Sequence, residues 1–171
     1  MQAGRAVVLM LVLLAAGAVL AQTEAETGDI YTDPLAYTRV NPGAESVPLT
    51  VQYQATGETR RAMGRYLLEG SQEMYLRSAT LATILKAGRY WQGELRHLDL
   101  KVGEQNFRVT AGTRVVVTTA GEMLLPVPVL DFDGDLWLPM VFLEKAVGPL
   151  TRERVSWDAT SRQLTLGSAD Y

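Results

Sequence analysis

The chain has 171 residues, of which 47% are hydrophobic and 20% are charged, and it contains no cysteine and one histidine. This length suits one domain, and the apolar content excludes a wholly disordered chain. The lack of cysteine excludes a disulfide scaffold, a zinc–thiolate site, an iron–sulfur cluster and a thiol nucleophile, and one histidine cannot build a histidine-rich metal centre. A net charge of −3 with scattered basic residues excludes the electrostatic footprint of nucleic-acid binding.

Residues 1–21 have the pattern of a signal peptide. Arg5 and the amino terminus form a short positive region, and an uncharged apolar run follows over residues 6–21. At about 1.5 Å per helical residue this run reaches about 24 Å, which is shorter than the ~30 Å hydrocarbon core of a bilayer. Val19 and Ala21 stand at positions −3 and −1 of a cleavage site before Gln22. Cleavage predicts an extracytoplasmic protein, either secreted or in the periplasm or cell envelope, with no membrane span; an uncleaved anchor is the alternative.

Residues 22–48 have the composition of a flexible or loosely docked linker. Polar and turn-forming residues dominate, hydrophobic periodicity is lacking, and Pro34, Pro42 and Pro48 disfavour helix in the residues before them. Tyr31 and Tyr37 are interpreted as ordinary linker aromatics, with contact to the domain or to a partner as the alternative. The folded domain is expected over residues 49–171.

Two similar stretches, at about residues 66–100 and 129–166, predict an internal repeat. In each stretch a tryptophan, Trp91 or Trp157, is followed seven and nine residues later by leucine. Each stretch also begins with a turn between apolar pairs. Each unit is therefore predicted to be a β-hairpin, a short helix and a second hairpin.

The second stretch shows the local signals most clearly. Asp133-Gly134 suits a tight hairpin turn, and Pro139 presets the backbone for a helix start. Gly88 and Gly148 are expected to end the two helices in the left-handed conformation. One apolar stripe of the second helix is formed by Leu143, Ala146 and Val147.

Residues 98–125 alternate apolar and polar side chains between turns at 103–104 and 120–121, which predicts half-buried antiparallel strands. Helices as short as these are not stable alone, so both are expected to lie on a sheet. The predicted fold class is α+β: an antiparallel sheet or meander with two short helices, built from two similar β-hairpin–helix–hairpin units.

The second stretch resembles the repeat of the copper amine oxidase amino-terminal-like domain, also called the stalk domain. The matching segments are 136–139 (Leu-Trp-Leu-Pro), 142–143 (Phe-Leu), 146–148 (Ala-Val-Gly) and 155–162 (Val-Ser-Trp-Asp-Ala-Thr-Ser-Arg). The first stretch and the strands between the two fit the same pattern. The chain departs from it at Arg77, where a proline is usual, and at Val141, where a basic residue is usual.

The resemblance implies a non-catalytic module of bacterial exported or envelope proteins. Such modules often precede a peptidoglycan amidase (N-acetylmuramoyl-L-alanine amidase) domain or accompany other secreted modules. The family name implies no copper, because the metal and the tyrosine-derived cofactor of the oxidases belong to a separate domain. No cofactor is therefore expected.

Two groups of residues are candidate metal ligands. His97 stands beside an alternating strand and is interpreted as a surface histidine of that strand, since one histidine with scattered methionines is a poor ligand set. Residues 131–135 (Asp-Phe-Asp-Gly-Asp) superficially resemble a calcium loop, but the glycine falls at the fourth position and Phe142 at the twelfth. A turn is favoured over a ligand loop.

Basic and aromatic residues provide the other candidates. Arg60, Arg61 and Arg65 form a short basic cluster, interpreted as a solvated face with anionic wall polymers as the alternative ligand. Trp91 and Trp157 occupy equivalent places and are expected to anchor the core rather than to stack on a ligand. Tyr90 is the best candidate for an exposed aromatic.

The acidic residues are spread along strands and turns, and no nucleophile motif or phosphate-binding glycine loop occurs. No catalytic, cofactor-binding or metal-binding residue is therefore predicted, and the chain is not expected to be an enzyme. The predicted function is an exported envelope module that binds cell-wall material or a partner protein, with its binding residues and oligomeric state unassigned. The alternative is an accessory or truncated amino-terminal part of a peptidoglycan amidase system, whose catalytic domain would lie beyond Tyr171 or on another chain.

Overall fold

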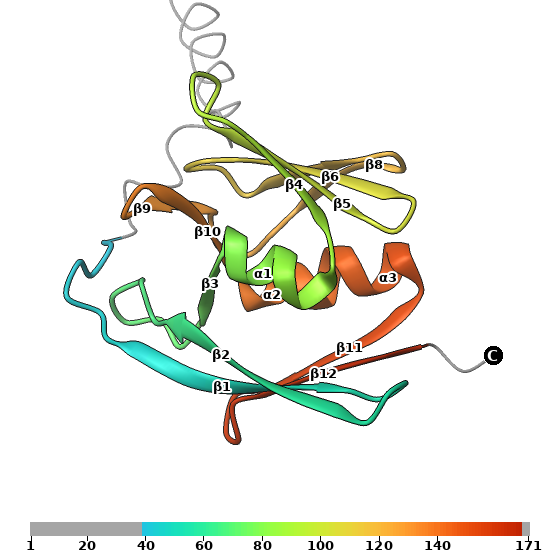
Figure 1. The fold of residues 1–171 in the computed structure, drawn as a ribbon. Coiled ribbons are helices and arrows are strands. Elements are labelled where there is room, and N and C mark those ends of the chain that lie inside the picture. The colour runs from blue at the N-terminus through green and yellow to red at the C-terminus, as the bar shows by residue number, and fades with distance from the viewer. Residues whose placement is uncertain (1–38, 169–171) are drawn as a thin grey trace, which may run out of the picture. The chain divides into compact units, whose positions relative to one another are not determined.

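The computed structural model describes residues 39–168, which form two β-sheets and two helices (Figure 1). In order across the first sheet, its seven strands are β11 (Glu153–Asp158), β12 (Gln163–Ser168), β1 (Ser46–Tyr53), β2 (Glu58–Arg65), β3 (Tyr75–Arg77), β10 (Asp135–Pro139) and β9 (Leu130–Phe132). The second sheet is a meander of five strands: β4 (Gly88–Gln92), β5 (His97–Val102), β6 (Gln105–Thr110), β7 (Val115–Thr118) and β8 (Gly121–Leu124). The α+β class and the antiparallel meander are confirmed.

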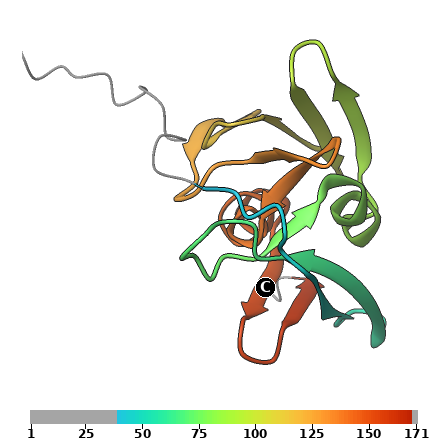
Figure 2. The ribbon, with the colours of Figure 1, turned by 90° about the vertical axis from the view of Figure 1, so that its left-hand side faces the viewer.

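The first helix is α1 (Ser78–Leu85). The second runs without a break through α2 (Met140–Phe142), a wider π-helical turn η1 (Leu143–Val147) and α3 (Gly148–Thr151). Both helices lie between the meander and the strands β1, β2, β11 and β12, as Figures 1 and 2 show. The arrangement differs from the predicted helices on an antiparallel meander in two respects: there are two sheets, and β1 pairs with β12 in parallel.

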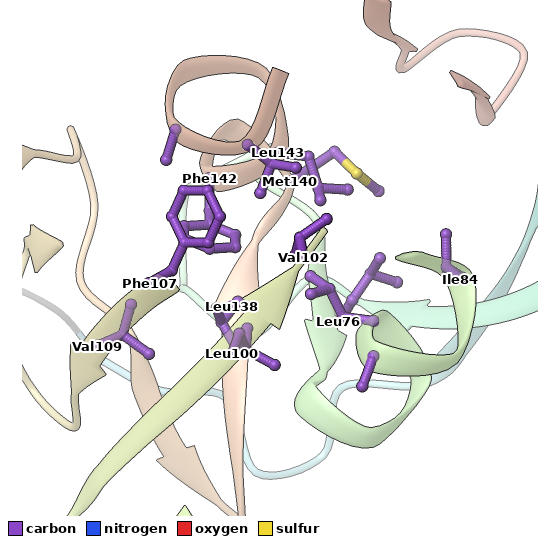
Figure 3. Close-up of a cluster of buried hydrophobic side chains, with 14 of the residues drawn as sticks. Leu76, Ile84, Leu100, Val102, Phe107, Val109, Leu138, Met140, Phe142 and Leu143 are labelled. Atoms are coloured by element: carbon purple, nitrogen blue, oxygen red, sulfur yellow. The ribbon is translucent and has the colours of Figure 1, made fainter. Parts of the chain in front are cut away.

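The main core fills the space between the two sheets (Figure 3). Leu143, Ala146 and Val147 are fully buried, which confirms the predicted apolar stripe. Phe142 of the second helix contacts Phe107 of β6 edge to face, with ring centroids 5.8 Å apart. Burial of apolar surface from both sheets and both helices in one cluster is the main favourable contribution to folding.

A smaller apolar cluster lies on the other face of the seven-stranded sheet. Its buried members are Leu67, Leu68, Tyr75, Leu130 and Trp137. Val40 and Ala44 pack against it from the segment before β1. The Asn41 N–H donates to the Leu67 carbonyl at 2.8 Å, and the Glu69 N–H donates to the Arg39 carbonyl at 2.9 Å.

These contacts correct the predicted boundary of the folded domain. Residues 39–48 were placed in the linker, but they are hydrogen-bonded to the domain and β1 already begins at Ser46. Local composition missed this because the partners of the segment lie some 25 residues further along the chain. The signal segment 1–21, the rest of the linker (22–38) and its tyrosines, Tyr31 and Tyr37, lie outside the described residues.

The turn at Asp133-Gly134 is confirmed: both residues have positive φ (53° and 73°), as a tight hairpin turn of this type requires. Pro139 is the last residue of β10 and directly precedes the helix, with φ of −68°. Its missing N–H costs nothing at this helix entry.

The predicted left-handed glycines were wrong. The left-handed residues at the helix ends are Lys86 (φ 52°) and Arg152 (φ 56°), whereas Gly88 begins β4 and Gly148 lies inside the second helix with φ of −51°. A Cβ atom at Gly148 would lie 3.2 Å from the Glu153 carbonyl oxygen. Gly148 is therefore explained by close packing of the helix against β11, not by its backbone conformation.

Replacing Arg152 with glycine is expected to raise the free energy of unfolding by about 1 kcal/mol, because glycine adopts the left-handed conformation without steric cost. Urea denaturation measures the effect. Arg152→Ala keeps the steric cost and serves as the control, for which no gain is expected. Equal stability of the glycine and alanine variants would contradict the explanation.

Candidate functional site

A buried polar cluster joins the two sheets at the start of α1. Asp135 of β10 is only 6% exposed, and its Oδ1 accepts hydrogen bonds from the Ser78 hydroxyl at 2.5 Å, from Arg89 Nη2 at 2.7 Å and from the Leu136 N–H at 2.8 Å. Arg77 Nε donates to Oδ2 at 3.0 Å, and Arg89 Nε also donates to the Ser78 hydroxyl at 2.8 Å. Arg89 lies in β4 and Asp135 in β10, so the cluster connects the meander with the seven-stranded sheet.

Burial by itself would raise the pKa of Asp135, but the hydrogen bonds from Ser78 and Arg89 and the charge of Arg89 outweigh it and lower the pKa. The carboxylate is therefore held ionised and its lone pairs are engaged. This arrangement fixes two sheets and a helix rather than preparing a group for proton transfer. The sequence patterns did not predict the cluster, although Arg77, directly before the first helix, was a signal for it.

The carboxylates of the acidic turn at residues 131–135 do not converge on a common position where a metal ion could bind. Asp131 pairs with Arg96 at 3.1 Å, whereas Asp135 is committed to the buried cluster. Within residues 39–168, no group of three or more His, Asp or Glu side chains is placed to hold a metal ion. The structure thus assigns separate roles to the aspartates that resembled a calcium loop.

His97 is half-buried at the start of β5. Its Nε2 atom is buried and has no hydrogen-bond partner within the described part of the chain. The neighbouring Asp99 accepts two hydrogen bonds from Arg108, at 2.7 and 3.0 Å, and those bonds lower the pKa of Asp99. The histidine is therefore less exposed than the surface position predicted for it, and its carboxylate neighbour is already engaged.

Glu73 and Glu144 lie close enough to interact electrostatically. Burial raises the pKa of Glu73, and the charge of Glu144 adds to the effect, while a hydrogen bond from the Val141 N–H opposes it. That bond is 2.8 Å long, and the Trp157 N–H donates to Glu144 Oε1 at 3.1 Å. Each carboxylate therefore accepts a bond from a backbone group at the second helix or its neighbouring strand, and this pair secures the packing of the helix.

The three arginines of β2 do not form the single cluster that their spacing in the sequence indicated. Arg60 pairs with Glu58 at 2.6 Å, and its guanidinium lies 5.7 Å from the ring centre of Tyr53. Arg65 lies over Trp137 at 5.4 Å. Arg61 points to the opposite side of the strand from Arg60, because successive side chains alternate between the faces of a sheet. Only Arg61 therefore remains for an external ligand.

Arg61 belongs to a polar array on the outer side of β11, β12, β1 and β2, opposite the main core. The inward residues Leu49, Val51, Leu164 and Leu166 are buried, so the alternate residues of the same strands face outward. Register places them in two rows across the four strands, Ser156–Thr165–Gln52–Thr59 and Asp158–Gln163–Thr50–Arg61. We call these eight residues the polar face.

The polar face is ordered by its own hydrogen bonds. Gln163 Nε2 donates to Gln52 Oε1 at 2.6 Å across the parallel strands. Its lone carboxylate, Asp158, accepts bonds from the Thr160 N–H and from the Ser161 N–H and hydroxyl in the β11–β12 turn. Amide, hydroxyl and guanidinium groups are thus presented on a two-dimensional grid.

A hollow of about 340 Å³ opens at one end of the polar face. It is lined by Pro48, Leu49, Thr50, Arg61, Ser161 and Arg162. We call it the arginine hollow. The sequence pattern indicated a cluster of Arg61 with Arg60 and Arg65, and Arg162, near the other end of the chain, had no predicted role. Alternation of side chains along β2 is the signal that separates Arg61 from its two neighbours.

Two further hollows, of about 170 and 300 Å³, flank Tyr53. The Tyr53 hydroxyl donates to the Ile84 carbonyl at 2.9 Å, and Lys86 Nζ lies 5.9 Å from the ring centre, as a second cation beside Arg60. The Tyr53 hydrogen bond therefore connects β1 to the end of α1. The two cations beside the Tyr53 ring, Arg60 and Lys86, already interact with that ring.

The aromatic predictions are confirmed in part. Trp91 and Trp157 pack against the main core, as expected, but both are half-buried rather than interior. Tyr90 is 62% exposed on the edge strand β4, which confirms it as an exposed aromatic. Trp137 is the buried indole, and its Nε1 donates to the Phe132 carbonyl at 2.8 Å.

No family model, curated protein or solved structure matched the chain. Within residues 39–168, none of the helices has the length and apolar character needed to cross a bilayer.

Proposed function

We propose that the chain is an exported, non-catalytic module of the cell envelope that binds cell-wall material through the polar face. The observation that carries the proposal is the grid of outward-facing amide, hydroxyl and guanidinium groups on four strands, of which Thr59, Arg61 and Ser156 are exposed and Thr50, Gln52, Gln163 and Thr165 are half-buried. Amides and hydroxyls both donate and accept hydrogen bonds, so such a grid suits the hydroxyl groups of a glycan. The signal-like segment at residues 1–21 supports a location outside the cytoplasm.

We further propose that the domain consists of two related hairpin–helix–hairpin units, as its resemblance to the copper amine oxidase amino-terminal-like domain implies. Two pairings of the same kind support this reading: Trp91 pairs with Leu98, and Trp157 with Leu164. In both hairpins the tryptophan lies opposite the leucine that follows it by seven residues.

The pairing of β3 with β10 is also what two related units would produce. Leu76 lies opposite Leu138, and Tyr75 and Arg77 lie opposite Pro139 and Trp137. When the two stretches are aligned, Tyr75 corresponds to Trp137 and Arg77 to Pro139. Each residue of one strand therefore pairs with the counterpart of the residue on the other side of the central leucine pair. That is the relation of a local two-fold axis.

The two units would differ in where their second hairpin lies. The β4–β5 hairpin opens the meander, whereas the β11–β12 hairpin joins β1 and β2 in the seven-stranded sheet. Of the two units, only the second therefore contributes to the polar face, through β11 and β12, while β1 and β2, which precede both units, supply the other four residues.

Retention of the purified chain on isolated sacculi tests wall binding. We expect retention, and we expect Thr59→Glu to reduce it several-fold, because the substitution places a carboxylate in the first row of the polar face. Asn106→Glu is the matched control, since Asn106 is an exposed strand residue of the other sheet. Failure of the unsubstituted chain to bind sacculi would remove wall binding and leave a partner protein as the ligand.

The resemblance favours a second candidate, in which the chain is an accessory or amino-terminal part of a peptidoglycan amidase system. Stimulation of a co-secreted amidase by the purified chain, together with an amidase-like reading frame beside its gene, would support it. An amidase rate unchanged by the chain would count against it.

A further inference from the structure

The arginine hollow exists because β1 extends past the start of its parallel neighbour. The first residue of β12, Gln163, lies opposite Thr50, so within the described part of the chain residues 46–49 of β1 have no strand beside them on that side. The Thr50 N–H closes the junction by donating to the Arg162 carbonyl at 2.9 Å. The end of the β11–β12 turn is thus fixed against β1, and the hollow lies beyond it.

Pro48 lines the hollow at a position where another residue would present a backbone donor. Backbone groups of a strand alternate in direction, so residue 48 faces the same side as the Thr50 N–H. Proline has no N–H, which protects this open stretch from pairing with another strand. Side chains rather than backbone donors therefore determine what the hollow binds.

Two guanidinium groups, those of Arg61 and Arg162, line the hollow and have no carboxylate partner among the residues that the structure describes. The ion pairs formed within residues 39–168 involve Arg60, Arg77, Arg89, Arg96 and Arg108, and neither Arg61 nor Arg162 is among them. The nearby carboxylate of Asp158 is occupied by the Thr160 and Ser161 groups of its own turn. The backbone of Arg162 is held in the left-handed conformation, with φ of 53°.

We propose that the arginine hollow binds an oxyanion, carboxylate or phosphate, carried by a wall glycan whose hydroxyl groups lie along the rows of the polar face. Guanidinium groups bind both kinds of oxyanion through paired hydrogen bonds, and two unpaired ones in a solvent-accessible hollow provide the charge complementarity. Thr50 belongs both to the hollow and to the second row of the polar face. A polymer whose anionic group binds in the hollow therefore has its neighbouring hydroxyl groups beside that row. The identification of the polymer as wall material rests on the proposed function. The proposal of an oxyanion site does not depend on that function, because it rests on the two arginines of the hollow.

Titration calorimetry at low salt, with the purified chain and three soluble polymers, tests the site. The polymers are a polyuronate, a poly(glycerol phosphate) and neutral dextran. We expect at least one anionic polymer to bind more tightly than dextran, which offers hydroxyl groups to the polar face but no oxyanion to the hollow, and the two anionic polymers distinguish a carboxylate from a phosphate source. Arg61→Gln with Arg162→Asn is expected to weaken binding by at least tenfold, because asparagine tolerates the left-handed conformation while the charge is lost.

Two control variants separate the site from general charge. Arg152→Asn also replaces an exposed left-handed arginine, with φ of 56°, and Lys101→Gln removes a positive charge from the exposed residue of β5 in the other sheet. Neither control is expected to change the affinity by more than about twofold. Arg61→Lys keeps the charge but loses the paired geometry, and an intermediate affinity is expected. Circular dichroism melts exclude unfolding as the cause of any loss.

Two results would overturn the site: no binding of either anionic polymer, or equal weakening by the hollow and control variants. Sacculus binding that the double variant leaves intact would reject a wall glycan as the ligand of the hollow, while the proposed function stands. Polymer binding that depends on the two arginines, without sacculus binding, would retain the oxyanion site and reject the wall as its source.

Discussion

Replacing Asp135 with alanine is expected to lower the free energy of unfolding by about 3 kcal/mol. The substitution leaves Ser78, which is fully buried, and the half-buried Arg89 without the acceptor that they share. An uncompensated buried donor or charge costs far more than a lost surface ion pair. Chemical denaturation, with the unfolding midpoint and slope fitted together, measures the loss.

Asp131→Ala is the matched control for Asp135→Ala. Asp131 stands in the same hairpin and also pairs with an arginine, but both partners are exposed, so a loss of at most about 1 kcal/mol is expected. Equal losses for the two variants would show that the buried cluster contributes no more than a surface pair.

The contribution of Asp135 should also depend on pH in a known direction. Its folded pKa is lowered, so the stability that it contributes is fully present above the unfolded value of about 3.9 and is lost as the pH falls through the folded value. The stability difference between the unsubstituted chain and Asp135→Asn is therefore expected to be constant near neutral pH and to shrink below about pH 4. A difference that grows on acidification would contradict the assignment.

Replacing Phe142 with alanine is expected to lower the free energy of unfolding by about 4 kcal/mol, because the substitution leaves a cavity beside Phe107 in the centre of the core. The ring connects the second helix to the meander, so its loss should also weaken protection of the helix amides in hydrogen exchange. Tyr90→Ala removes an aromatic side chain that is 62% exposed, and a loss of less than about 1 kcal/mol is expected. Similar losses of unfolding free energy for Phe142→Ala and Tyr90→Ala would contradict a central role of Phe142 in the core.

Signals that act over a few residues predicted the structure well. The Asp133-Gly134 turn, the apolar stripe of the second helix and the alternation that produces β5–β8 depend on neighbours in the chain, and all are present. Features set by distant segments were not predicted. The parallel pairing of β1 with β12 joins residues more than 100 positions apart, and no local pattern specifies it.

The same distinction explains what was missed in the candidate site. Arg61 and Arg162 meet only because β1 and β12 pair, and Arg89 reaches Asp135 only because the meander packs over the helices. Gly148 had the place in the sequence of a helix-ending glycine, yet its role is set by the approach of β11. In each case the deciding partner lies in another element, so residue type and spacing were insufficient.

The parallel pairing of β1 and β12 determines how the domain responds to mechanical tension. Because the two strands run in the same direction, Ser46 stands at one end of the pair and Ser168 at the other. Tension between these two residues pulls the strands along each other and loads their evenly spaced hydrogen bonds together, rather than opening them one at a time. The fold is thus arranged to resist stretching along its own chain.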